Sequence, residues 1–151
     1  MIHVLCFGNE LHGDDGFGVH VGRALDGRLE PGRARLFEVG GRVMDAVSLA
    51  DGCAQLVLVD ALRATGAPPG TLYEIDADAA QAFDGGVAHG GGVGWLVRAV
   101  RAAIRPCPRI TLIGAVVLDC APFDAGLSPD VALRVPDAAE RVCRIVGGTA
   151  S

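Results

Sequence analysis

Short apolar runs bounded by turn residues alternate with stretches of helical periodicity along this chain. Apolar runs of about four to eight residues are typical of strands buried in a sheet, and apolar repeats every three to four positions indicate helices packed on it. The predicted strands span Ile2–Phe7, Ala34–Val39, Gln55–Asp60, Thr71–Ile75 and Arg109–Leu118. The first predicted helix follows Asp14 and Asp15 and has Phe17, Val21, Ala24 and Leu25 on one face. Further helices are predicted at Val43–Ala50, at Val93–Ile104 with Trp95, Leu96, Val100 and Ala103 facing inward, and from about Pro136 to Val146. Ser128-Pro129 indicates another helix start, with Ser128 as the N-cap and Pro129 at the first helical position.

The connection after Asp60 departs from this alternation. Only ten residues separate Asp60 from Thr71, and they include Pro68-Pro69-Gly70. A parallel crossover needs a dozen or more residues, so Thr71–Ile75 is predicted to run antiparallel to the strand before it. The expected fold is a single α/β domain over residues 1–151: a three-layer sandwich whose five-stranded sheet is mostly parallel, with one antiparallel strand and helices on both faces.

Composition narrows the functional classes. The 151 residues carry a formal net charge of −5, and all 13 basic residues are arginines. Chemistry that needs a lysine is therefore excluded, and the acidic balance argues against nucleic acid and anionic membranes as partners. No apolar window is long enough for a membrane span, and the N-terminus does not resemble a signal peptide. Five scattered cysteines indicate a reduced, cytoplasmic protein with buried thiols.

Chain tracing places three polar residues on one edge of the predicted sheet. Asp15 follows the first strand, Asp60 ends the third, and the loop Asp76–Gly92 returns to the same edge with His89 near its end. Ligands of such sheets bind outside the carboxyl ends of the parallel strands. Two carboxylates and an imidazole form a donor set that suits a divalent transition metal.

Structural roles compete with this interpretation at each position. Asp14 or Asp15 could cap the following helix, and His89 could simply precede the next one. Asp60, after four apolar residues, is harder to explain in this way, because a buried acid is costly without a partner. A nucleotide-binding domain is a further alternative, but the first turn lacks a G-x-G-x-x-G pattern and its two acids would repel a phosphate.

The segment Gly8-Asn9-Glu10-Leu11-His12-Gly13-Asp14-Asp15-Gly16-Phe17-Gly18 resembles the opening signature of the hydrogenase maturation endopeptidases. The resemblance continues at Leu56-Val57-Leu58-Val59-Asp60-Ala61, Pro69-Gly70-Thr71, His89, Thr111-Leu112-Ile113-Gly114 and Gly126-Leu127-Ser128-Pro129. Each motif is short, but their order and spacing extend over nearly the whole chain.

This resemblance implies an endopeptidase that removes the C-terminal extension of a nickel-iron hydrogenase large-subunit precursor. It implies Asp15, Asp60 and His89 as the metal-contacting and catalytic residues. It also implies that nickel arrives bound to the precursor, with other divalent metals able to substitute in vitro. Whether the metal or a carboxylate activates the attacking water stays open. The protein is expected to be a cytoplasmic monomer.

One departure concerns the second strand, where the resemblance implies an acid before a Gly-Gly turn. This chain reads Glu38-Val39-Gly40-Gly41-Arg42, with valine at the acidic position. Because side chains alternate along a strand, Glu38 is expected to point to the opposite face unless the strand slips by one residue. A catalytically weak paralogue that binds a metallated partner without cutting it is therefore the alternative function.

Overall fold

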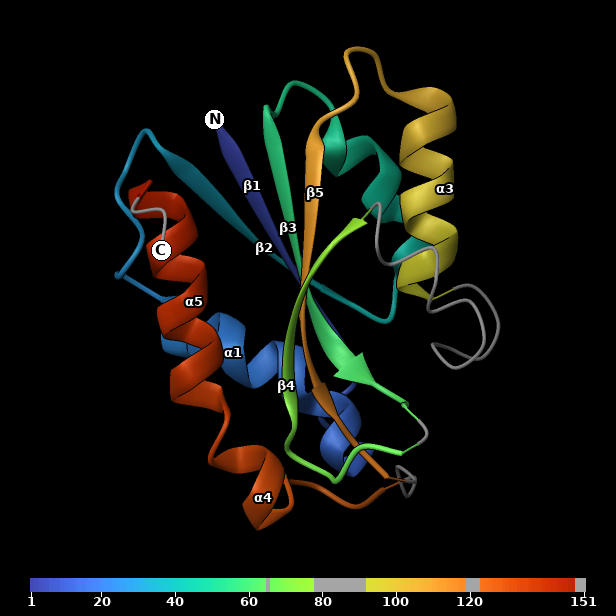
Figure 1. The fold of residues 1–151 in the computed structure, drawn as a ribbon, viewed down its shortest axis with the longest axis vertical. Coiled ribbons are helices and arrows are strands. Elements are labelled where there is room, and N and C mark those ends of the chain that lie inside the picture. The colour runs from blue at the N-terminus through green and yellow to red at the C-terminus, as the bar shows by residue number, and fades with distance from the viewer. Residues whose placement is uncertain (65, 78–91, 119–122, 149–151) are drawn as a thin grey trace.

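The computed structural model describes residues 1–64, 66–77, 92–118 and 123–148. Within them, five strands form one sheet in the order β2-β1-β3-β5-β4 (Figure 1). The strands are β1 (Ile2–Phe7), β2 (Ala34–Gly40), β3 (Gln55–Leu62), β4 (Leu72–Asp76) and β5 (Arg109–Val116). Four of them are parallel, and β4 pairs with β5 in the antiparallel direction at the edge of the sheet. The predicted fold class is confirmed.

Helical segments cover both faces of the sheet. The α-helices are α1 (Phe17–Leu25), α3 (Val93–Ala103), α4 (Pro129–Ala132) and α5 (Val135–Gly147), and the 3-10 helices are η1 (Gly13–Gly16) and η2 (Val43–Ala50). Helices α1 and α5 lie on one face, and α3 lies with η2 on the other (Figure 1). The molecule therefore has three layers with two apolar cores.

The alternation of side chains along the central strands builds these two cores. Val4 and Cys6 of β1 face α1 and α5, whereas Leu5 and Phe7 face α3 and η2. All four side chains are buried. A parallel sheet covered on both faces needs apolar residues at successive positions, which is why the strands could be recognised as short continuous apolar runs.

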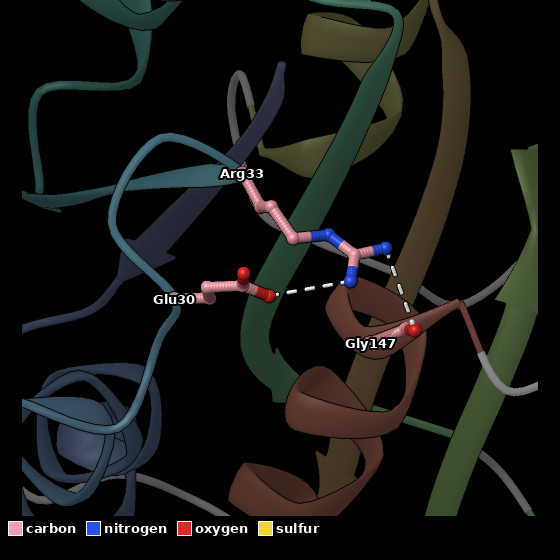
Figure 2. Close-up of polar contacts among 3 residues, drawn as sticks. All are labelled: Glu30, Arg33 and Gly147. Carbon is pink, nitrogen blue, oxygen red and sulfur yellow. Dashed lines mark hydrogen bonds and ion pairs between the residues drawn. The ribbon is translucent and has the colours of Figure 1, made fainter.

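The end of α5 is joined to the loop before β2 (Figure 2). The Arg33 guanidinium donates to the Glu30 carboxylate over 3.2 Å and to the carbonyl of Gly147 over 3.4 Å. Gly148 ends the helix with a φ of 72°, a left-handed conformation that glycine adopts without steric cost. These groups are exposed, so the contact orients the chain more than it stabilises the fold.

The third strand is longer than the sequence indicated. Asp60 was expected to end it, but β3 continues to Leu62, because Asp60, Ala61 and Leu62 pair with Gly114, Ala115 and Val116 of β5. An acid after four apolar residues looks like a strand end in the sequence. Here it lies inside a strand, at the point where pairing with β1 has stopped and pairing with β5 continues.

Smaller differences have local causes. The predicted helix Val43–Ala50 is a 3-10 helix. Ser128 precedes α4 as predicted, but its hydroxyl makes no capping hydrogen bond, because it is bonded to Asp14 instead. In α3, Leu96 and Val100 are buried as predicted, whereas Trp95 is half-buried and Ala103 is exposed. The predicted loop Asp76–Gly92 lies mostly outside the described residues.

Cysteine burial agrees only in part with the prediction. Cys6 and Cys53 are buried free thiols, while Cys107 is exposed and Cys143 is half-buried. Within the described ranges, none of the helices has the length and apolar character that a membrane crossing requires.

Candidate active site

A pocket opens at the carboxyl ends of β1, β2 and β3. Helix α1 follows β1 on one face of the sheet, and η2 connects β2 to β3 on the other face. The connections therefore change sides between the neighbouring strands β1 and β3, and ligands bind in such a crevice. The pocket has a volume of about 200 Å³. Its lining comes from the ends of these strands, from η1, from the starts of η2 and α3, and from the residue after β5. The lining residues are Phe7, Gly8, Asp15, Gly40, Gly41, Val43, Asp60, Ala61, Arg63, Gly92 and Val117.

Asp15 enters this pocket from η1, directly after β1. Its Oδ2 accepts a hydrogen bond from the backbone N–H of Asn9 over 3.0 Å, and the same N–H lies 3.2 Å from the Asp15 carbonyl oxygen. The Asn9 side chain in turn accepts from the N–H of Leu11 over 3.0 Å. The turn after β1 thus holds the Asp15 carboxylate through its own backbone.

Gly8 is required for this close approach. Its φ is +123°, and a Cβ at this position would lie 1.9 Å from the Asp15 carbonyl oxygen. Only a residue without a side chain allows the end of β1 and the acidic turn to meet in this way. The Gly8-Asn9 part of the sequence signature therefore has a direct structural reason.

Asp60 enters the pocket from the middle of β3. It alternates with Leu58 and Leu62 on the face that packs against α3 and η2, so its carboxyl group stands in an apolar row. Its Oδ1 accepts a hydrogen bond from the N–H of Ala61 over 2.8 Å. Burial raises the pKa of Asp60 to about 7, partly offset by the Ala61 hydrogen bond and reinforced by the negative charge of Asp15.

Asp15 and Asp60 line the same pocket, where the negative charge of Asp15 adds to the raised pKa of Asp60. A carboxyl group whose pKa lies near neutrality can accept or release a proton at physiological pH. A cation placed between the two would favour both ionised forms. The pocket is therefore suited to proton transfer and to binding a positively charged group.

His89, the third residue predicted for this site, lies outside the described residues. Gly92, three positions later, lines the pocket. The part of the chain that the structure describes contains no cluster of three histidine, cysteine or acidic side chains that could hold a metal ion. Asp15 and Asp60 are thus the two predicted donors that the structure brings together.

Sequence reasoning did not select Arg63 or the Gly40-Gly41 turn, which also line the pocket. The signal was present, because each follows a parallel strand at the same edge as Asp60. Glu38 lies away from the pocket, as predicted: its side chain lies near Cys6 and Gly22, on the face of α1. Val39 points to the opposite face and is buried in the core with α3.

His3 has a structural role. It is buried in β1, and its Nδ1–H donates to the carbonyl of Leu49 over 2.6 Å. This contact ties β1 to the end of η2 on the face away from α1. Its neighbour in sequence, Ile2, belongs to the opposite core, as the alternation of a strand requires.

Two acidic side chains lie in the crevice at the carboxyl edge of this sheet. This arrangement is typical of α/β proteins that bind a ligand at the carboxyl ends of their parallel strands. Residues 19–145 match the sequence profile of hydrogenase maturation proteases, and this chain belongs to that family. It is accordingly a member of a family of hydrolases that mature hydrogenases. No curated protein sequence gives a significant match.

Solved structures with the same fold include hydrogenase maturation proteases. The hydrogenase maturating endopeptidase HybD from E. coli is 24% identical, with a TM-score of 0.83 over 97% of this chain and 92% of that chain. The [NiFe] hydrogenase maturation protease HybD from Thermococcus kodakarensis is 23% identical, with a TM-score of 0.80 over 96% of this chain and 98% of that chain. At these identities the similarity shows a shared fold.

Proposed function

We propose that this protein is a processing endopeptidase that removes the C-terminal extension of a nickel-iron hydrogenase large-subunit precursor. The observation that carries the proposal is the pairing of Asp15 and Asp60 in one pocket at the carboxyl edge of the sheet, in a member of the maturation protease family. A structural pair of acids would be costly there, because burial and the negative charge of Asp15 both disfavour the ionised form of Asp60. A cationic substrate group offsets that cost.

Nickel already bound to the precursor is the cation that we propose. Asp15 and Asp60 supply carboxylate oxygens from two separate elements, and His89 would add an imidazole, a common ligand of nickel. Three residues of extended chain span at most about 11 Å, so the position of Gly92 at the pocket supports a role for His89 there. The metal is part of the substrate, so the protein needs no resident ion.

Peptide hydrolysis then requires a water molecule next to the scissile carbonyl. Asp60 can take the proton of that water and pass it to the leaving amine nitrogen, because burial keeps its pKa near neutrality in the free protein. Nickel close to the scissile bond can polarise the carbonyl group. The attacking water can be activated by the metal or by a carboxylate, and this donor set is compatible with both. Either route needs Asp15 and Asp60.

The partner in this proposal is a folded precursor that presents a flexible tail. The pocket lies at the surface, where the ends of three strands and the start of α3 meet, so an extended segment can enter it without opening the core. The odd number of scattered cysteines supports a reducing compartment, and we propose the cytoplasm. We expect one copy of the protein to act on each precursor.

The proposal is tested by incubating the protein with a nickel-loaded large-subunit precursor and measuring the released tail by mass spectrometry. Asp15→Asn and Asp60→Asn each remove one charge at nearly constant volume and should reduce processing at least about 100-fold. His89→Ala should have a comparable effect. Asp26→Asn, at an exposed position beyond α1, is the matched control and should process normally. Normal processing by both pocket variants would contradict the proposal.

Binding without cleavage is a second candidate, and one observation favours it. Val39 stands where the resemblance implies an acid, and its side chain is buried in the core. A protein of this kind would form a stable complex with the nickel-loaded precursor and leave its length unchanged. The same mass measurement, combined with size-exclusion chromatography, separates this outcome from cleavage.

A further inference from the structure

The two neighbouring acids of η1 face different partners. Asp15 faces the pocket, whereas Asp14 contacts Ser128, the residue that precedes α4. Asp14 Oδ1 accepts from the Ser128 N–H over 2.6 Å, and Asp14 Oδ2 accepts from the Ser128 hydroxyl over 2.7 Å. Both carboxylate oxygens are therefore used in one contact between segments that are 114 positions apart in the sequence.

Backbone contacts continue this junction. The N–H of Gly13 donates to the carbonyl of Asp124 over 2.5 Å, and His12 forms a parallel bridge with Asp124. The segment 124–128 thus contacts the acidic turn at residues 12 to 14, and the Asn9 amide contacts it at Asp15. The turn is therefore held by two separate parts of the chain.

The turn needs such support because it is short. A 3-10 helix has poorer hydrogen-bond geometry than an α-helix, and η1 has four residues and no side-chain cap. Hydrogen bonds to a carboxylate are about twice as strong as neutral ones. The Asp14–Ser128 contact is the only side-chain contact with charge assistance between η1 and the C-terminal part of the chain that the structure describes.

We propose that Asp14 is a positioning residue: its paired hydrogen bonds to Ser128 fix the turn that aims Asp15 into the pocket. Its importance for cleavage rests on the proposed function, but its effect on the geometry of Asp15 does not. Asp14 itself touches no substrate in this account. Its role depends on accepting and sharing hydrogen bonds, and its charge takes no part in the reaction.

Two substitutions separate this role from a chemical one. In Asp14→Asn, the amide oxygen can accept from the Ser128 N–H while the amide N–H donates to the Ser128 hydroxyl oxygen, so both links persist without the charge. In Asp14→Ala, both links are lost. Ser128→Ala keeps the backbone link and removes only the hydroxyl.

The experiment measures two quantities for each variant. The first is the single-turnover cleavage rate at saturating nickel-loaded precursor. We expect it to fall about 10- to 100-fold in Asp14→Ala, because small displacements of a reacting group have effects of this size. We expect changes within about threefold in Asp14→Asn and Ser128→Ala, since each keeps at least one of the two links.

The second quantity is the hydrogen-exchange rate of the Asn9 amide, which donates to Asp15 and needs no substrate. It should rise at least about tenfold in Asp14→Ala and stay near the wild-type rate in Asp14→Asn, while core amides such as that of Val142 remain unchanged in both. Equal acceleration of Asn9 and Val142 would indicate general destabilisation and overturn the positioning role. So would an Asp14→Asn variant that is as slow in cleavage as Asp14→Ala. If the wild-type protein cleaves no precursor, the proposed function fails, while the Asn9 amide still decides the role of Asp14.

Discussion

In the proposed mechanism, Asp60 is the residue on which the chemistry depends most. It occupies an apolar row of β3 between Leu58 and Leu62, on the face that packs against α3 and η2. Its carboxylate accepts a hydrogen bond from the neighbouring N–H of Ala61, which stabilises the ionised form only in part. A carboxyl group in such a place is retained for a ligand or a proton, because an apolar side chain would pack at lower cost.

The raised pKa of Asp60 makes stability depend on pH in a defined direction. The folded protein binds the Asp60 proton up to about pH 7, whereas the unfolded chain releases it near the ordinary value of 3.8. The folded state therefore holds more protons between these values, and the contribution of Asp60 to stability is full below about pH 4 and is lost as pH rises through 7. The loss is on the order of a few kcal/mol.

Asp60→Asn removes this titration. We expect the free energy of unfolding of the variant, measured with denaturant, to equal or exceed that of the wild type at pH 8 and to show a weaker pH dependence between pH 4 and 8. Asp26→Asn should follow the wild-type curve. A variant clearly less stable than the wild type at pH 8 would assign Asp60 a structural role at the sheet edge.

Asp15 and Asp60 should also define where a divalent metal binds. Soaking crystals with Ni²⁺ or another soft divalent cation is expected to give one anomalous peak between the two carboxylates, with His89 as a third ligand. The peak should disappear in Asp60→Asn crystals soaked in the same way. A peak elsewhere, or none between these side chains, would show that the site assignment is wrong.

At the scale of elements, the junction of β1, η1 and α1 sets the position of the acidic turn. Helix α1 lies so close to the sheet that a Cβ on Gly18 would be 2.1 Å from the Phe7 carbonyl oxygen and 2.6 Å from that of Val59. These are backbone atoms of the two central strands, and they cannot move without disturbing the sheet. The glycine thus allows the helix to begin directly above the strands that carry the site.

Gly18→Ala is therefore expected to lower the free energy of unfolding by about 2 to 4 kcal/mol. Gly147→Ala is the matched control, since no atom lies within 4 Å of a Cβ built there and it is the last residue of helix α5. It should be neutral or stabilising by up to about 1 kcal/mol. Thermal and denaturant unfolding measure both. Equal effects of the two substitutions would show that α1 has room for a methyl group at Gly18 and would contradict this prediction.

The elements that the sequence predicted well are those with one dominant physical signal. Apolar runs located the strands to within about two residues, and the ten-residue connection after Asp60 predicted the direction of β4. Features that depend on distant partners were not predictable. The extension of β3 to Leu62 needs pairing with β5, and the Ser128 hydroxyl leaves its expected capping role because Asp14 approaches from the other end of the chain.

At the scale of the whole molecule, the topology explains why two acids 45 positions apart share a pocket. Helix α1, which follows β1, and η2, which leads into β3, lie on opposite faces of the sheet, so a crevice forms at the carboxyl ends of these two strands. Asp15 follows β1, Asp60 lies near the end of β3, and both line this crevice. This rule let the sequence place Asp15 and Asp60 on one rim. The same rule places Arg63 and the Gly40-Gly41 turn at this edge, but which of the residues there line the pocket depends on how side chains and loops pack.

Nickel dependence of cleavage is the most direct test of the proposed function. The large-subunit precursor is prepared with and without nickel, incubated with the wild-type protein, and analysed for loss of its C-terminal tail by intact mass. We predict rapid removal of the tail from the nickel-loaded precursor and removal at least about 100-fold slower from the nickel-free form, with neither cleaved by Asp60→Asn. Equal cleavage of both forms, or cleavage that persists in Asp60→Asn, would contradict the account.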